Sequence, residues 1–103
     1  LSEAQYAERA IPLDYDKLAE DPNGYSDEIV DFSGKVTEIL RAEAPPLFLL
    51  DVGTPSEPKI LLVEYLGQTS IEAGRRYQFK GQPAGEQDGH IFIRARLGYR
   101  FRW

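Results

Sequence analysis

Apolar and polar side chains alternate along residues 29–40, a run of twelve residues that is too long and too regular for an ordinary half-buried strand. Gly34 lies in the middle of the apolar face, and a glycine inside a strand marks a bulge, a sharp bend or a close backbone approach. The pattern therefore predicts a long, coiled first strand that opens a small barrel. The apolar face of this strand is predicted to consist of Val30, Phe32, Val36 and Leu40.

Four shorter segments also have the composition of strands, and residues that break strands separate them. A hairpin loop is predicted over residues 82–89, where Asp88-Gly89 suits positive backbone dihedrals. The connection over residues 67–74 is too short and too broken for a helix. The four strands are predicted at residues 47–52, 60–65, 75–81 and 90–97. The predicted core consists of Val30, Phe32, Val36, Phe48, Leu50, Leu61, Val63, Tyr77, Phe79, Ile91 and Ile93.

Two short helices are expected before the first strand. Ser2 and Gln5 have the spacing of a capping box, which predicts a helix at the start of the chain. Asp14 can cap a second helix over residues 15–20, which ends before Pro22. A helix this short needs packing against a larger apolar surface, so it is expected to rest on the barrel.

Five strands, one of them long enough to serve both halves of a closed sheet, indicate an all-β fold with short N-terminal helices. The specific architecture expected is a five-stranded Greek-key barrel of the OB type. A plain sandwich or an SH3-like barrel is the alternative. Residues 1–27 are predicted to form a helical segment that packs on or plugs the barrel of residues 28–103, within one domain.

Several spaced motifs over about residues 11–85 resemble small bacterial OB-fold domains of the tRNA-anti-like kind. In that group a helical segment with Leu, Pro and Tyr precedes a strand that reads V-x-F-x-G-x-V. The resemblance implies the barrel fold and assigns no ligand, and many such domains are exported or attached to membranes. The arginine-rich last strand does not match the group. The matching motifs are Tyr15-x-x-Leu18, Pro22-x-x-Tyr25, Val30-x-Phe32-x-Gly34-x-Val36 and Tyr77-x-Phe79-x-Gly81.

The net charge of −5 conceals a division along the chain. Residues 1–74 contain fifteen acidic and five basic residues, whereas residues 75–103 contain two acidic and seven basic residues. We expect the two parts to neutralise each other in the fold, because the chain as a whole is too acidic for strong phosphate binding. The absence of cysteine excludes disulfides, thiolate metal sites and cysteine nucleophiles.

Few residues suggest catalysis or metal binding. His90 has no second histidine or cysteine to act with, and it is interpreted as a solvated residue at the start of a strand. The acidic residues around the second predicted helix lack the ligand spacing of a calcium loop, and no glycine-rich phosphate loop is present. We therefore expect no catalytic residue, no cofactor and no metal, and predict that the protein is not an enzyme. The acidic residues in question are Asp14, Asp16, Glu20 and Asp21.

One surface has the character of a binding site. Aromatic rings that stack on bases and guanidinium groups that contact phosphates are typical of single-strand binders. The alternative is that Phe92 and Trp103 cover the outside of the barrel while the arginines pair with the acidic part of the chain. The second and third strands, where OB folds usually bind, are nearly balanced in charge. The candidate surface consists of Phe92, Arg94, Arg96, Tyr99, Arg100 and Arg102.

The leading hypothesis is a non-enzymatic OB-fold binding or interaction module whose partner is a protein or a component of the cell envelope. The alternatives are single-stranded nucleic-acid or oligosaccharide binding and, as a distant third, a carboxylate-based hydrolase. No apolar run is long enough for a transmembrane helix. The chain begins at Leu1 and lacks methionine, so we expect a processed or shortened product. An upstream segment would then decide the compartment, with export or envelope association as one outcome.

Overall fold

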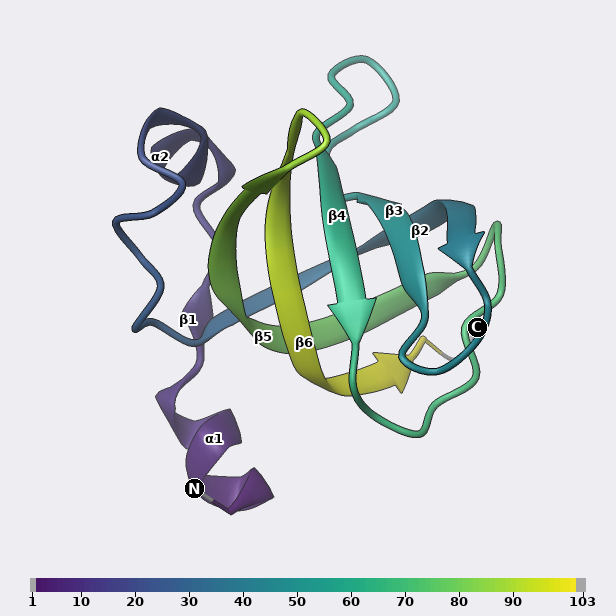
Figure 1. The fold of residues 1–103 in the computed structure, drawn as a ribbon, viewed down its shortest axis with the longest axis horizontal. Coiled ribbons are helices and arrows are strands. Elements are labelled where there is room, and N and C mark those ends of the chain that lie inside the picture. Colours follow the sequence, from purple (N-terminus) through teal and green to yellow (C-terminus); the bar gives the residue numbers. More distant parts are fainter. Residues whose placement is uncertain (1, 102–103) are drawn as a thin grey trace.

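A computed structural model describes residues 2–101 as a closed five-stranded β-barrel preceded by two short helices (Figure 1). The barrel order is β2-β3-β4-β6-β5, and pairing of β2 with β5 closes it. Within the barrel β4 and β6 run parallel and the other pairs run antiparallel. The predicted all-β class is confirmed, and this order is compatible with an OB-type barrel. The elements are α1 (Glu3–Arg9), β1 (Ile11–Pro12), α2 (Tyr15–Glu20), β2 (Val30–Arg41), β3 (Leu47–Asp51), β4 (Ile60–Tyr65), β5 (Arg76–Gln87) and β6 (His90–Arg100).

The long strand β2 joins both halves of the barrel, as its sequence predicts. Its first half pairs with β5 and its second half pairs with β3, and the change of partner occurs at Lys35. A Cβ atom added to the neighbouring Gly34 would lie 2.2 Å from the carbonyl oxygen of Asp51 on β3. Only a residue without a side chain permits this approach, so the predicted close backbone contact at Gly34 is confirmed.

The eleven residues predicted from the sequence to form the core are all buried. Phe79 is at the centre of the core, and four aromatic rings surround it with centroid distances of 5.4–5.8 Å. Gly98 leaves room for this ring, because a Cβ atom there would lie 2.8 Å from Phe79. Leu18, Tyr65 and Ala95 also belong to this core cluster.

The prediction that Leu40 faces the core is wrong. A register shift between Val36 and Glu38 inserts a bulge into β2, which reverses the faces of the residues that follow. Ile39 therefore packs against the core, and the side chain of Leu40 is 47% exposed.

The predicted loop over residues 82–89 is also wrong in extent, because β5 continues to Gln87. Pro83 is accommodated by a register shift between Pro83 and Glu86, where Gly85 has a φ of 83°. The turn itself contains Asp88 and Gly89, with φ values of 54° and 80°. The interpretation of this pair as a tight turn with positive dihedrals is therefore confirmed.

Different segments pack on the two ends and the outside of the barrel. The capping box of α1 and the Asp14 cap of α2 form as predicted. Leu18 of α2 enters the core cluster, whereas Tyr6 of α1 packs with Ile29 and Leu97 in a second cluster. Sequence analysis missed β1, which pairs in parallel with the start of β2. None of the described helices is long and apolar enough to cross a membrane.

The connection from β4 to β5 contains no helix among its described residues, as predicted. It is anchored instead by two core tyrosines. The Thr69 amide donates to the Tyr65 hydroxyl at 3.2 Å, and the Glu72 amide donates to the Tyr77 hydroxyl at 2.8 Å. These bonds place Glu72, Gly74 and Arg75 beside the start of β5.

Candidate functional site

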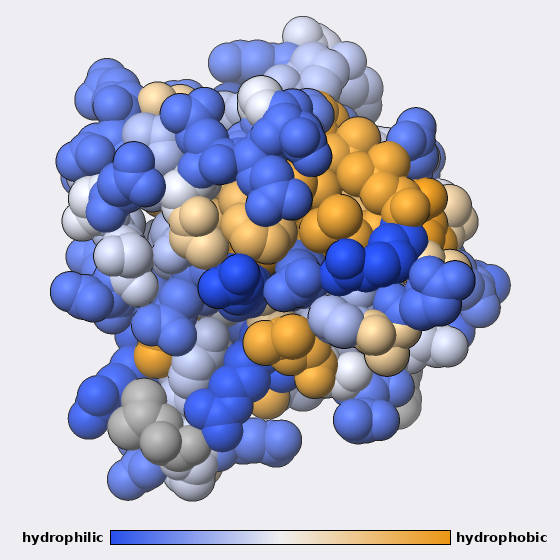
Figure 2. Space-filling view, viewed as in Figure 1, coloured by the Kyte–Doolittle hydropathy of each residue, from blue (hydrophilic) through white to orange (hydrophobic). Residues whose placement is uncertain are grey.

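The outer face of β3, β4 and β6 carries an apolar row beside a charged row. Leu61 and Val63 point into the core, so the alternating residues Leu62 and Glu64 of β4 point outward. Cross-strand pairing places Leu62 between Leu49 and Phe92, and Glu64 between Leu47 and Arg94. Hydrophobic side chains gather over β3 and β4 beside a strongly hydrophilic band (Figure 2).

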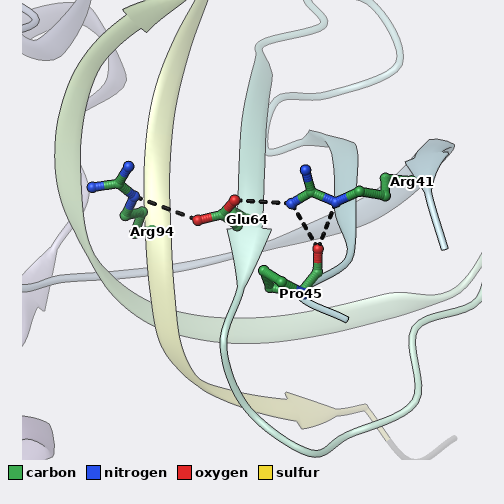
Figure 3. A network of polar contacts seen from close by, with 4 residues as sticks. All are labelled: Arg41, Pro45, Glu64 and Arg94. Atoms are coloured by element: carbon green, nitrogen blue, oxygen red, sulfur yellow. Dashed lines mark hydrogen bonds and ion pairs between the residues drawn. The ribbon is translucent and has the colours of Figure 1, made fainter. Parts of the chain in front are cut away.

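Glu64 forms the centre of a polar network on this face (Figure 3). The Arg41 guanidinium donates to Glu64 Oε2 at 2.9 Å, and Arg94 Nε lies 3.4 Å from Glu64 Oε1. Arg41 also donates twice to the carbonyl oxygen of Pro45, at 2.9 and 2.8 Å. Arg41 therefore holds the turn between β2 and β3 against β4, and one carboxylate forms ion pairs with both arginines.

Phe92 points outward but is only 5% exposed. The Arg94 guanidinium carbon lies 5.6 Å from the centroid of its ring, which is cation–π distance. Leu62, its neighbour on β4, is fully buried. The ring that the sequence suggested for base stacking is therefore packed into the surface and is not open to a flat ligand.

The five described residues of the predicted surface do not form one continuous site. Gly81 pairs with Ala95 and Lys80 pairs with Leu97, so Arg96 occupies a bulge and the faces of β6 reverse beyond it. Arg96 lies over the Tyr6 ring of α1 at 5.0 Å. This reversal separates Arg94 from the end of β6.

The end of β6 contacts other parts of the barrel. The Lys80 ammonium lies 5.4 Å from the centroid of the Tyr99 ring. Arg100 lines a separate cleft together with residues of β2 and β5. Arg102 and Trp103 lie outside the described residues. Among the described residues of the predicted surface, only Phe92 and Arg94 therefore belong to the outer face of β3, β4 and β6.

The pKa of Tyr6 is displaced from the ordinary value of a tyrosine. Burial raises the pKa of its phenol, and the positive charge of Arg96 lowers it by a smaller amount. The neutral phenol is thus favoured when α1 is packed on the barrel.

Basic residues of the C-terminal part pair with carboxylates of residues 1–74, as the charge division predicts. Lys80 lies 3.6 Å from Asp31, and Arg94 and Arg75 contact Glu64 and Glu72 respectively. These pairs are partly or largely exposed, so each contributes little to stability. Their main effect is to remove excess charge from particular places on the surface.

A cleft of about 660 Å³ lies between α2 and the barrel and is lined by Asp14, Asp16 and Asp31 among others. The Asp31 carboxylate accepts from the Gln78 amide at 2.9 and 3.1 Å and faces Lys80, so its oxygens are already engaged. Within residues 2–101 no three histidine or acidic side chains are gathered as a metal site would require. His90 is half-buried at the start of β6.

No protein-family model and no curated protein matches this chain. The functional argument therefore depends on surface chemistry. Sequence reasoning missed Arg41 and Lys35 as candidate site residues. Arg41 is brought to Glu64 of β4, and Lys35 to Arg76 of β5, only by the folding of the barrel. Pairing of the first and fourth strands of an OB-type barrel is the signal that would place Lys35 beside Arg76.

Proposed function

We propose that this domain is a non-enzymatic binding module that docks a protein partner on the outer face of β3, β4 and β6. The observation that carries the proposal is the pair of partly exposed leucines on β3, Leu47 and Leu49, beside the Arg41–Glu64–Arg94 network. The buried Leu62 and Phe92 continue this apolar row and support it from below. An apolar centre with arginines at a polar rim is the composition expected of a protein interface. Leu40, 47% exposed on β2, adds apolar area at the end of the barrel strands.

The same face favours a protein over single-stranded nucleic acid. Single-strand binders present open aromatic rings and unneutralised cations. Here Phe92 is packed beneath Arg94, and both neighbouring arginines form ion pairs with Glu64. The net charge of −5 opposes the approach of a polyanion at long range. An oligosaccharide, which also stacks on open rings, is disfavoured by the burial of Phe92 for the same reason.

We also propose a relation to the small bacterial OB-fold domains of the tRNA-anti-like kind. Two observations support it. The barrel order is compatible with an OB fold, and Gly34 of the V-x-F-x-G-x-V motif lies where β2 changes partner. The relation carries no ligand to this chain, so the partner has to be identified by experiment.

Site-specific photo-crosslinking in the source cells tests the protein-docking proposal. A photoreactive residue at Leu49, on the proposed face, is expected to give a discrete protein adduct. The same residue at Asp88, in the β5–β6 turn, is the control and is expected to give none. Arg94→Glu is expected to abolish the adduct at Leu49 without unfolding the domain, because Arg94 is 60% exposed. Equal adducts at both positions, or none, would contradict the proposal.

Titration with a labelled oligonucleotide tests the nucleic-acid alternative. We expect no binding at ~0.1 M salt. A phosphate track with four to six contacts would give a slope of about −3 to −4 in log affinity against log salt for single strands. Micromolar binding that disappears when Arg94 and Arg96 are replaced together would replace the protein proposal with nucleic-acid binding.

A further inference from the structure

A cleft of about 300 Å³ between β2, β5 and β6 concentrates positive charge in an acidic protein. It lies where the end of β6 pairs with the start of β5. Four of its lining residues are basic, and we call it the basic cleft. Its lining consists of Lys35, Gly74, Arg75, Arg76, Arg100 and Phe101.

The backbone pairing forces two of these charges together. Lys35 of β2 and Arg76 of β5 are directly opposite partners in an antiparallel ladder, so their side chains leave the sheet on the same face. Like charges at such positions destabilise a sheet. Arg100 is brought to the same cleft because it pairs with Tyr77, the residue after Arg76. The fold thus places basic side chains from three strands at one point.

Little negative charge compensates this cluster. Arg75 forms an ion pair with Glu72. Among residues 2–101, Lys35, Arg76 and Arg100 make no ion pair with a carboxylate. Asp51 is the partner of Lys35 on β3, but its carboxylate accepts from the backbone amides of Gly53 and Lys59 instead. By contrast, Lys59, Lys80 and Arg94 elsewhere on the barrel each have a carboxylate partner. The cleft is therefore a local excess of positive charge that an anion from solution would relieve.

We propose that the basic cleft binds a small ligand that carries two or more linked phosphate groups. Arginine forks match phosphate oxygens in pairs, and lysine supplies a compact point charge. The cleft is at the small end of the volumes that hold ligands, so its charge requires a compact partner of high charge density. A polycarboxylate of equal charge needs a larger frame for the same number of charges. The phosphates can belong to a soluble molecule or to a lipid headgroup.

Calorimetric titration with sodium tripolyphosphate at ~0.1 M salt tests this proposal. We expect one site in the unmodified protein. Affinity should fall at least about tenfold in the double variant Arg76→Gln, Arg100→Gln, because two forks are lost. Arg94→Gln is the matched control, since it removes an exposed arginine of the outer face, and it should bind within about twofold of the parent.

NMR locates the site independently of the variants. Tripolyphosphate is expected to shift the amide resonances of Gly74, Arg75 and Phe101 and to leave those of Leu49 and Leu62 unchanged. Unchanged thermal melting of the double variant would show that the loss of binding is not unfolding. If the double variant melts early, Lys35→Gln in place of the double variant must weaken binding for the proposal to stand.

Vesicles distinguish the two sources of phosphate. Co-sedimentation with phosphatidylinositol bisphosphate vesicles that tripolyphosphate displaces would support the cleft with a membrane ligand. Binding of tripolyphosphate without vesicle binding would support it with a soluble ligand. Absence of any tripolyphosphate binding, equal weakening by Arg94→Gln, or binding of an oligonucleotide alone would overturn the proposal.

Discussion

Two arginine-bearing regions of this barrel differ in what their charges face. On the outer face, Glu64 lies between Arg41 and Arg94 and forms an ion pair with each. In the basic cleft, the ladder sets Lys35 against Arg76, and neither forms an ion pair with a carboxylate within the described residues. Asp51, the partner of Lys35 on β3, accepts from the backbone amides of Gly53 and Lys59 instead. The first region pairs its arginines within the chain and borders the partly exposed Leu47 and Leu49. The second leaves its cations to be paired by an anion from solution.

Gly34 lies on β2, the strand that contributes to both regions, next to the position where β2 changes partner. Its replacement has the largest expected effect on the free energy of unfolding. Gly34→Val places a side chain against the Asp51 backbone of β3 and disturbs the strand that carries Lys35. We expect a loss of about 3 kcal/mol in the free energy of unfolding, measured by chemical denaturation. Ser33→Val, at an exposed neighbouring position, is the control and should be nearly neutral. A Gly34→Val variant as stable as the parent would show that β2 does not need this close approach.

Glu64→Gln tests the ion pairs on the outer face of β3, β4 and β6. The variant keeps the size of the side chain but removes the charge that faces two arginines. We expect a loss of about 1 kcal/mol, because the contacts are only partly buried. The measurement is again the free energy of unfolding. Glu38→Gln, exposed on β2, should change it by much less. Equal effects of the two variants would mean that the ion pairs of Glu64 do not contribute to the free energy of unfolding.

Arg76→Glu tests the basic cleft, and here the expected sign is opposite. A carboxylate opposite Lys35 replaces a repulsive cross-strand pair with an attractive one. Lys35 is kept in this variant because its other ladder partner is the acidic Asp51. We expect a gain of about 0.5 kcal/mol in the free energy of unfolding, together with loss of tripolyphosphate binding. Arg76→Gln, which only removes the repulsion, should give a smaller gain. Destabilisation by Arg76→Glu would contradict the view that Lys35 and Arg76 oppose each other.

Tyr6 provides the smallest expected effect and concerns the helix that covers Arg96. Burial raises the pKa of Tyr6 above its unfolded value, so folding favours the neutral phenol. The associated stability is present below the ordinary tyrosine pKa of about 10 and is lost as pH rises above it. Melting curves followed from about pH 9 to 11 should show a weaker decline in Tyr6→Phe. Tyr99→Phe, at a half-exposed ring, should decline as the parent does.

Local patterns in the sequence were sufficient to predict the two helices, the five strands of the barrel and eleven residues of its core. Alternation placed Val30, Phe32 and Phe79 in the core, and the Ser2 and Asp14 caps located both helices. These signals depend on residues close together in the chain, because side-chain direction in a strand repeats every second residue. Prediction failed at Leu40 and over residues 82–89, where bulges change the count of residues between facing positions.

The candidate sites depended on tertiary structure for the same reason. Phe92, Arg94, Arg96 and Arg100 are close in sequence, yet the bulge at Arg96 distributes them over different surfaces. Lys35 and Arg76 are distant in sequence and become opposite partners through closure of the barrel. The sequence by itself determined eleven residues of the core and how much charge the chain carries. Only the closed barrel decided which charges face one another, because cross-strand register is a property of paired strands.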